Sequence, residues 1–232
     1  MKIKIFADGA DKQDMLRLYA DPLIKGFTTN PTLMRKAGIT QYEVFAKDIL
    51  GHIPDRPISF EVFSDEFDEM ERQALKIASW GPNVFVKIPV TNCAGDPTYE
   101  LVRRLAARKV QVNVTAILTL DQARAVSAAL EDHAASFISI FAGRIADTGR
   151  DPVPLMAAAV DVCHAFRRQE LIWASPRELL NLYHAESIGC HVITVTSDIL
   201  KKLSLVDKDL ALYSLETVRM FREDAVAAGF HL

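Results

Sequence analysis

The sequence predicts an α/β fold: a (β/α)8 barrel, or TIM barrel, with an additional C-terminal helix. Strand-like and helix-like segments alternate along the chain without a linker or low-complexity stretch. No GxGxxG motif follows a strand, which argues against an open dinucleotide-binding sheet. Half of the 232 residues are hydrophobic, enough for one sizeable core. We therefore expect one barrel domain over residues 1–232, with residues 207–230 as a helical extension.

The predicted strands are short runs of β-branched, aliphatic and aromatic residues bounded by turn residues. They cover residues 3–8, 24–28, 57–63, 84–88, 110–115, 136–141, 171–174 and 191–195. The run over 84–88 is the most informative, because Lys87 places one amine among apolar side chains.

The segments between the strands carry apolar residues at helical spacing. They cover residues 11–19, 31–50, 64–79, 97–108, 119–131, 152–167, 177–186 and 198–203. Pro31 suits the first position of a helix, and Ser64 suits an N-cap. A last helix is predicted over residues 209–228, with Gly229 as the residue that ends it.

Composition and charge exclude several kinds of partner. The net charge is −3 and no basic block occurs, so we expect neither nucleic acid nor a membrane surface as partner. Cys93, Cys163 and Cys190 form no disulfide framework and no CxxC pair, and the six histidines lack metal-ligand spacing. The first eight residues alternate as a strand and show no apolar signal region. We expect a cytoplasmic protein without a metal.

Polar residues recur near the ends of most predicted strands. They are Asp8, Asn30, Glu61, Lys87, Asn113, Thr115, Ser139 and Ser175. The steps from position 61 to 87, to 113 and to 139 are each 26 residues, about the length of one β/α unit. Because the carboxyl ends of the strands meet at one mouth of such a barrel, we expect these side chains to face a common site.

Lys87 is the candidate nucleophile. Within a buried run it must reach water, pair with a carboxylate, or lose its proton. A neutral amine attacks carbonyl substrates, and the resulting iminium is an electron sink for breaking an adjacent carbon–carbon bond. Glu61 is a candidate for proton transfer, alone or through a water held by Thr115. The alternative is a Glu61–Lys87 salt bridge that keeps the lysine charged and unreactive.

Two arginines suggest a phosphate on the substrate. Arg144 and Arg177 each follow a late strand, where backbone N–H groups at a helix start add to the positive charge. Late βα loops are a frequent phosphate site in these barrels, although either arginine alone is equally well explained as a solvated surface residue. Asp8 and Asn30 suit contacts with substrate hydroxyls, and the alternatives are a turn residue and a helix cap.

Four segments resemble, in order, the signatures of the transaldolase family. They are Gly26-Phe27-Thr28-Thr29-Asn30-Pro31-Thr32, Val86-Lys87-Ile88-Pro89-Val90-Thr91, Asn113-Val114-Thr115-Ala116-Ile117 and Phe141-Ala142-Gly143-Arg144-Ile145. The resemblance implies a class I (β/α)8 transferase that moves a dihydroxyacetone unit between sugar phosphates, without metal or cofactor. Sedoheptulose 7-phosphate and fructose 6-phosphate are the usual donors in that family.

The resemblance also implies a role for each polar residue. It places the Schiff base on Lys87 and proton transfer on Glu61 with a water near Thr115. Substrate hydroxyls are implied to contact Asp8, Thr29, Asn30, Asn113 and Ser139, with Asp8 also in the catalytic set. Phosphate binding is implied for Arg144, Ser175 and Arg177.

Two positions separate the branches of the family. Fructose-6-phosphate aldolases carry glutamine in place of Glu61 and tyrosine in place of Phe141, so the chain resembles the transaldolase branch and transfer is expected over cleavage. Pro176 departs from the usual aromatic or aliphatic residue, which affects the expected geometry of Arg177. An aldolase-like C–C lyase and a catalytically inactive phosphosugar-binding barrel remain as alternatives.

The C-terminal helix suggests an assembly. The short transaldolases, which the chain resembles, form rings in which the terminal helix crosses to a neighbour. We therefore expect a homo-oligomer through this helix, and the alternative is packing across its own barrel mouth.

Overall fold

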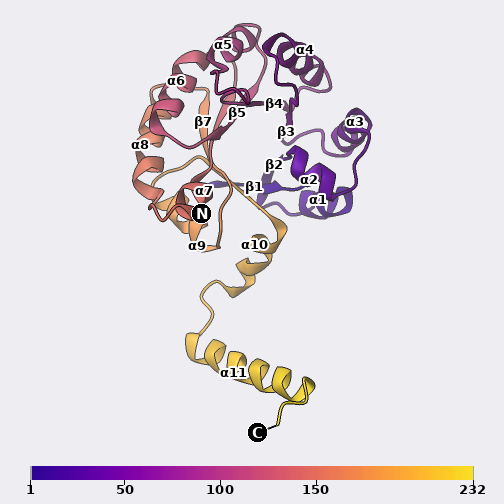
Figure 1. Ribbon diagram of the computed structural model, residues 1–232, viewed down its shortest axis with the longest axis vertical. Helices are drawn as coiled ribbons and strands as arrows, with labels where there is room; N and C mark the ends of the chain where they lie inside the picture. The colour runs from indigo at the N-terminus through magenta and orange to yellow at the C-terminus, as the bar shows by residue number, and fades with distance from the viewer. Residues whose placement is uncertain (1, 232) are drawn as a thin grey trace. The chain divides into compact units, whose positions relative to one another are not determined.

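The computed structural model describes residues 2–231 and contains a closed barrel of parallel strands (Figure 1). The strands pair in chain order, and β8 closes the barrel by pairing with β1. Their bounds are β1 Lys4–Asp8, β2 Ile24–Thr28, β3 Ile58–Glu61, β4 Val84–Pro89, β5 Val112–Ile117, β6 Ser136–Ile140, β7 Gln169–Trp173 and β8 Val192–Val195. The predicted (β/α)8 fold is confirmed.

Helices follow the strands and surround the barrel (Figure 1). Those of the first half are α1 Lys12–Tyr19, α2 Pro31–Lys36, α3 Tyr42–His52, α4 Phe67–Ala78 and α5 Tyr99–Ala107. Those of the second half are α6 Leu120–Leu130, α7 Ala142–Asp147, α8 Val153–His164 and α9 Leu180–Ser187. After β8 the chain continues with α10 Ser197–Lys201, the 3₁₀ helix η1 Lys202–Leu205 and α11 Leu210–Ala227.

The chain divides into two compact units. The first ends at Leu200 and holds the barrel, and the second begins at Lys201 and holds α11. In the second unit the side chain of Asp209 accepts a hydrogen bond from the Leu212 N–H and so caps α11. Gly229 has a φ of +68°, which agrees with its predicted place just beyond the helix. Between residues 2 and 231, no helix combines the length and apolarity that crossing a membrane requires.

The start of α2 confirms one local prediction. Pro31 occupies the first turn, and the Asn30 side chain accepts a hydrogen bond of 2.9 Å from the Leu33 N–H. This cap fixes Asn30 in an extended conformation at the end of β2, with φ −154° and ψ 161°. The first of the four segments that resemble transaldolase signatures, residues 26–32, is therefore also the junction between β2 and α2.

Two local predictions were wrong, and one short helix was missed. The helix expected over residues 31–50 is two helices, because the chain turns after α2 through Gly38, whose φ is +71°. Ser64 does not cap α4: Glu66 is the N-cap residue, and Ser64 Oγ accepts a bond from the Glu66 N–H. The short helix α7 was not predicted, since its six residues are too few to show helical spacing.

An aromatic cluster fills the interior of the barrel. The rings of Phe85 and Phe137 lie 4.3 Å apart between centroids, and Phe6 meets Phe137 edge to face at 5.5 Å. Gly26 makes room for this packing, because a Cβ there would lie 2.6 Å from the Phe6 ring. Phe141 packs against the same cluster. The barrel is thus a solid core, and any site must lie at one of its mouths.

Candidate active site

A cavity of about 600 Å³ opens at the carboxyl ends of the strands. Nine of the predicted site residues line it: Asp8, Asn30, Glu61, Lys87, Thr115, Ser139, Arg144, Ser175 and Arg177. Thr29 and Asn113 do not line it, because both are fully buried in the layer beneath. The structure therefore brings together most of the residues that the sequence pattern selected.

Two of the three intervals of 26 residues correspond to strand register, whereas Asn113 pairs with Phe137 and not with Ser139. Glu61 and Lys87 are Cα partners on β3 and β4, and Lys87 and Asn113 are Cα partners on β4 and β5. Side chains in register on neighbouring parallel strands face the same side of the sheet. These three residues therefore form one row across the barrel wall, with Lys87 in the middle.

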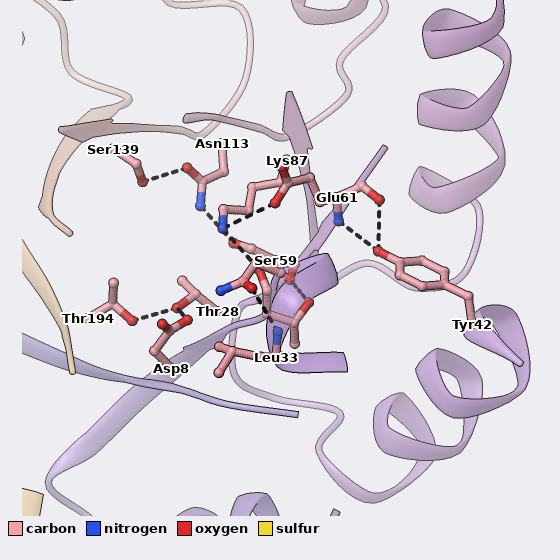
Figure 2. A network of polar contacts seen from close by, with 12 residues as sticks. Asp8, Thr28, Leu33, Tyr42, Ser59, Glu61, Lys87, Asn113, Ser139 and Thr194 are labelled. Atoms are coloured by element: carbon pink, nitrogen blue, oxygen red, sulfur yellow. Dashed lines mark hydrogen bonds and ion pairs between the residues drawn. The ribbon is translucent and has the colours of Figure 1, made fainter. Parts of the chain in front are cut away.

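Thr29 and Asn113 belong to a buried layer of hydrogen bonds that joins the end of β2 to β3, β5 and β6; Figure 2 shows Ser59, Asn113 and Ser139 of this layer. Asn113 Nδ2 donates to Ser59 Oγ at 2.9 Å, and Ser139 Oγ donates to Asn113 Oδ1 at 2.7 Å. Thr29 Oγ1 donates to the Ser59 carbonyl at 2.8 Å. We infer that Thr29 and Asn113 hold the cavity floor in shape, because their own polar groups are already paired.

Lys87 is only 6% exposed and has two oxygen neighbours (Figure 2). Its Nζ donates to the Thr29 carbonyl at 3.0 Å and lies 3.5 Å from Glu61 Oε2. The ion pair that was the alternative reading of Glu61 is thus geometrically present. From 3.5 Å, a small approach of the two groups brings them within the roughly 2.6–3.2 Å that direct proton transfer requires.

Both carboxyl groups beside Lys87 have perturbed pKa values. Burial raises the pKa of Glu61 above its ordinary value, although the positive charge of Lys87 opposes the shift. Burial likewise raises the pKa of Asp8, opposed by Lys87 and by a 2.7 Å hydrogen bond from Thr28 Oγ1. Carboxyl groups with raised pKa values exchange protons more readily near neutral pH, as general acids and bases require.

Thr115 carries an unpaired polar atom. Its Oγ1 is buried and has no hydrogen-bond partner among residues 2–231. The next residue, Ala116, has a φ of +62°, and the pairing register of β5 and β6 shifts between Val114 and Ile117. This irregularity, at the side chain that lines the cavity, leaves a hydroxyl ready to bind a water or a substrate oxygen.

The arginine side of the cavity depends on a close backbone approach. A Cβ at Gly143 would lie 1.6 Å from the carbonyl oxygen of Ser175, so only glycine fits at this point of α7. Ser175 itself has a φ of +59°, in the left-handed region. The contact holds the segment of Arg144 against the loop that carries Arg177.

The two arginines differ in their present partners. Arg177 Nε donates to Asp147 Oδ1 at 2.9 Å, and this contact lowers the pKa of the Asp147 carboxyl. The Arg144 guanidinium lies over the Phe141 ring, 5.4 Å from its centroid. A phosphate bound by both arginines would compete with Asp147 for Arg177.

The cavity also holds residues that the sequence reasoning missed. Thr28, Thr194 and Thr196 lie at the ends of β2 and β8, and Lys36 ends α2. The rule of a polar residue at each strand end, applied to β8, selects Thr194. Lys36 has no such signal, because a lysine at a helix end is ordinarily a solvated residue. Within residues 2–231, no three His, Cys, Asp or Glu side chains are grouped as metal ligands.

Fold and site together define a (β/α)8-barrel protein with a buried lysine between two carboxyl groups at the carboxyl mouth. The chain belongs to the transaldolase/fructose-6-phosphate aldolase family, which it matches over residues 5–231.

Two named relatives agree with this assignment. The chain is 34% identical over 212 residues to "Probable transaldolase 2" of Listeria monocytogenes, covering 90% of this chain and 93% of the relative. It is 31% identical over 202 residues to "Probable transaldolase" of Dehalococcoides mccartyi, covering 87% and 90%. Among solved structures, 3-hexulose-6-phosphate synthase from Salmonella typhimurium is similar in fold, with a TM-score of 0.57, 15% identity, and coverage of 87% and 91%.

Proposed function

We propose that the chain is a class I transaldolase, which transfers a dihydroxyacetone unit between sugar phosphates through a Schiff base on Lys87. One observation carries the proposal: the Lys87 amine faces the cavity and lies 3.5 Å from Glu61, a carboxyl group whose pKa burial raises. The names of the relatives and the glutamate at position 61 favour transfer over simple cleavage.

The first half of the reaction joins the donor to the protein. Lys87 Nζ attacks the ketone carbon of a ketose phosphate and forms a carbinolamine. Before the attack the Glu61 carboxylate takes a proton from Lys87 Nζ, and through a water at Thr115 it then gives that proton to the departing hydroxyl, so that loss of water leaves an iminium. The donor phosphate lies toward Arg144 and Arg177, whose guanidinium groups suit phosphate oxygens.

The second half breaks and remakes a carbon–carbon bond. Asp8 takes the proton of the hydroxyl next to the scissile bond, the bond breaks, and an aldehyde leaves while its electron pair converts the iminium into an enamine. The enamine then attacks an acceptor aldehyde, whose new alkoxide recovers the proton from Asp8. Hydrolysis of the new iminium releases the product ketose and restores the Lys87 amine. The iminium nitrogen is the electron sink throughout, so the proposed reaction needs neither metal nor cofactor.

Two other functions make different predictions. The Glu61–Lys87 contact also suits an inactive phosphosugar-binding barrel, in which the pair holds the lysine charged. An aldolase-like lyase would release the three-carbon unit without an acceptor. Dependence of product formation on an added acceptor aldehyde separates a transferase from that lyase.

Borohydride trapping tests the proposal directly. The protein is incubated with fructose 6-phosphate, reduced with sodium borohydride, and analysed by intact mass and peptide mapping. We expect a dihydroxyacetone-sized adduct on Lys87 that is absent from Lys87→Ala and retained in Lys36→Ala, an exposed lysine of the same cavity. No adduct in the folded wild-type protein with any ketose phosphate would overturn the proposal in favour of the binding barrel.

The acidic limb of the pH–rate profile should lie at higher pH than the ordinary carboxyl pKa of 4.5 for Glu61. The reason is that burial raises the pKa of Glu61, so a step that needs its carboxylate fails as the pH falls through the raised value. Glu61→Gln should lower kcat by roughly 10²–10⁴-fold and leave only the limb set by Asp8. A wild-type limb at or below 4.5 in kcat/KM would contradict this assignment.

The homo-oligomer remains part of the proposal and rests on helix α11. No residue of α11 is buried within the single chain, and several large apolar side chains are exposed: Leu210, Leu212, Leu215, Val218, Phe221 and Val226. Apolar patches of this kind are usual at subunit interfaces.

The double variant Leu215→Glu/Phe221→Glu should convert the oligomer into a monomer with an unchanged fold, because both side chains are exposed in the single chain. Light scattering after size-exclusion chromatography measures the mass. Arg219→Glu, which changes the net charge by the same amount, is the control and should keep the oligomer. An identical mass for the double variant and the wild type would exclude this interface.

A further inference from the structure

The hydrogen-bond ladder between β2 and β3 is interrupted beside Lys87. In a parallel pair, the N–H of a residue donates to a carbonyl on the neighbouring strand. The carbonyl of the same residue accepts from the N–H two positions further along that strand. The Phe27 N–H donates to the Pro57 carbonyl and the Thr29 N–H to the Ser59 carbonyl, as this pattern requires. The next bond should run from the Glu61 N–H to the Thr29 carbonyl. The Glu61 N–H instead donates to Tyr42 Oη at 2.8 Å.

At this point the Tyr42 hydroxyl takes the place of the β2 backbone as the hydrogen-bond partner of Glu61 (Figure 2). Tyr42 is the first residue of α3. Its hydroxyl accepts a hydrogen bond from the Glu61 N–H and donates one to the Glu61 carbonyl, each at 2.8 Å. One hydroxyl thus satisfies both polar groups of the Glu61 backbone. Burial raises the pKa of Tyr42, so the hydroxyl keeps the proton that it donates.

The exchange of partners releases the Thr29 carbonyl for Lys87. That carbonyl accepts from Lys87 Nζ at 3.0 Å, in place of the Glu61 N–H. A neutral amine has two N–H bonds and one lone pair. With one N–H on the Thr29 carbonyl and the other toward Glu61 Oε2 at 3.5 Å, the lone pair points away from both oxygens. Because Lys87 lines the cavity, this is the orientation that attack on a bound ketone requires.

Tyr42 is fixed by neighbouring rings. Phe60, Phe63 and Trp80 lie 6.4, 5.6 and 5.9 Å from its ring centroid. Such contacts restrict the ring, so the position of the hydroxyl is set by packing rather than by Glu61 alone. The cluster therefore gives the hydroxyl the rigidity that a positioning role needs.

We propose that Tyr42 is a positioning residue for the reaction: its hydroxyl holds the Glu61 backbone off the β2 ladder, and so gives Lys87 the Thr29 carbonyl that orients its amine. The inference rests on the proposed Schiff-base function for its kinetic consequence. Its structural consequence is independent of that function. The Tyr42 side chain does not line the cavity, and its hydroxyl bonds only to the Glu61 backbone, so it acts on Lys87 through Glu61 and Thr29.

Tyr42→Phe tests the proposal, because it keeps the ring and removes only the hydroxyl. In a crystal structure of this variant, the Glu61 N–H should move to hydrogen-bond distance from the Thr29 carbonyl. The rate of borohydride-trapped adduct formation and kcat should fall roughly ten- to a hundredfold, while KM changes less than about threefold, because the amine and not the substrate contacts is displaced.

Trp80→Phe is the matched control. It loosens the same aromatic cluster without removing a hydrogen bond, since Trp80 Nε1 has no partner among residues 2–231. It should destabilise the protein and leave kcat near the wild-type value. Equal losses of kcat in both variants, or a Tyr42→Phe structure in which the Glu61 backbone has not moved, would overturn the inference. If wild-type protein forms no adduct, the proposed function fails instead, and the crystal structure of Tyr42→Phe decides the positioning role.

Discussion

Replacing Lys87 with methionine is expected to lower kcat/KM by at least about 10⁴-fold, the scale of loss seen when a covalent nucleophile is removed. Methionine keeps most of the apolar length of the side chain but has no amine to form the iminium. The measurement is acceptor-dependent formation of ketose phosphate from fructose 6-phosphate. Lys36→Met, which removes an exposed lysine from the same cavity, should lose less than about tenfold. Comparable losses in the two variants would exclude Lys87 as the nucleophile.

The same substitution should change stability in a pH-dependent way. Without Lys87, the largest effect that opposes burial is lost at both Asp8 and Glu61, and the pKa of each carboxyl rises further. A carboxyl with a raised pKa binds its proton more tightly in the folded state, so it favours folding below its unfolded pKa and loses that contribution as the pH rises through the folded pKa.

We therefore expect Lys87→Met to cost about 3 kcal/mol of unfolding free energy at pH 8, where two buried carboxylates lack their cation, and less at pH 5. Urea unfolding at the two pH values measures the difference. A destabilisation that is larger at pH 5 than at pH 8 would show that the two carboxyl groups do not depend on Lys87 for their charge.

Gly143→Ala should raise KM for phosphorylated substrates by roughly 10²-fold, the cost of a displacement of about 1 Å at a binding group. The added Cβ would lie 1.6 Å from the Ser175 carbonyl oxygen, so the loop carrying Arg177 must move. Steady-state kinetics with a ketose phosphate and its unphosphorylated ketose measure the effect, and only the former should be affected.

Gly51→Ala is the control for Gly143→Ala. Gly51 lies in α3, a Cβ there meets nothing within 4 Å, and alanine suits a helix better than glycine. This variant should keep wild-type KM and be slightly more stable. Unchanged KM in Gly143→Ala as well would mean that the arginine segment does not bind the substrate phosphate.

The barrel and most of its site were predictable because they depend on local repetition. The units that begin at β3 and β4 are close in length, 26 and 28 residues from one strand start to the next, so equal spacing between their polar residues became equal height in the barrel. Glu61, Lys87 and Asn113 are the clearest case, since their intervals of 26 residues became Cα pairing across β3, β4 and β5.

The remaining features depend on contacts between segments that the sequence does not place side by side. The approach of Gly143 to Ser175 joins two different βα loops, and the role of Tyr42 requires that α3 reach the end of β3. Local signals also competed with each other: Ser64 suits a helix cap, yet α4 begins only after Glu66. The pattern separates strand ends from strand interiors only to within a residue or two, so it does not show that Thr29 and Asn113 lie beneath the cavity instead of lining it.

The buried layer around Ser59 has a consequence for how the mouth opens. Ser59 accepts bonds from Thr29 and Asn113, and Asn113 accepts one from Ser139, so β2, β3, β5 and β6 share one set of side-chain bonds. Separation of any of these strands at the level of Ser59 and Asn113 breaks a bond that another strand uses. Local opening of these strands is therefore disfavoured in the layer beneath the cavity.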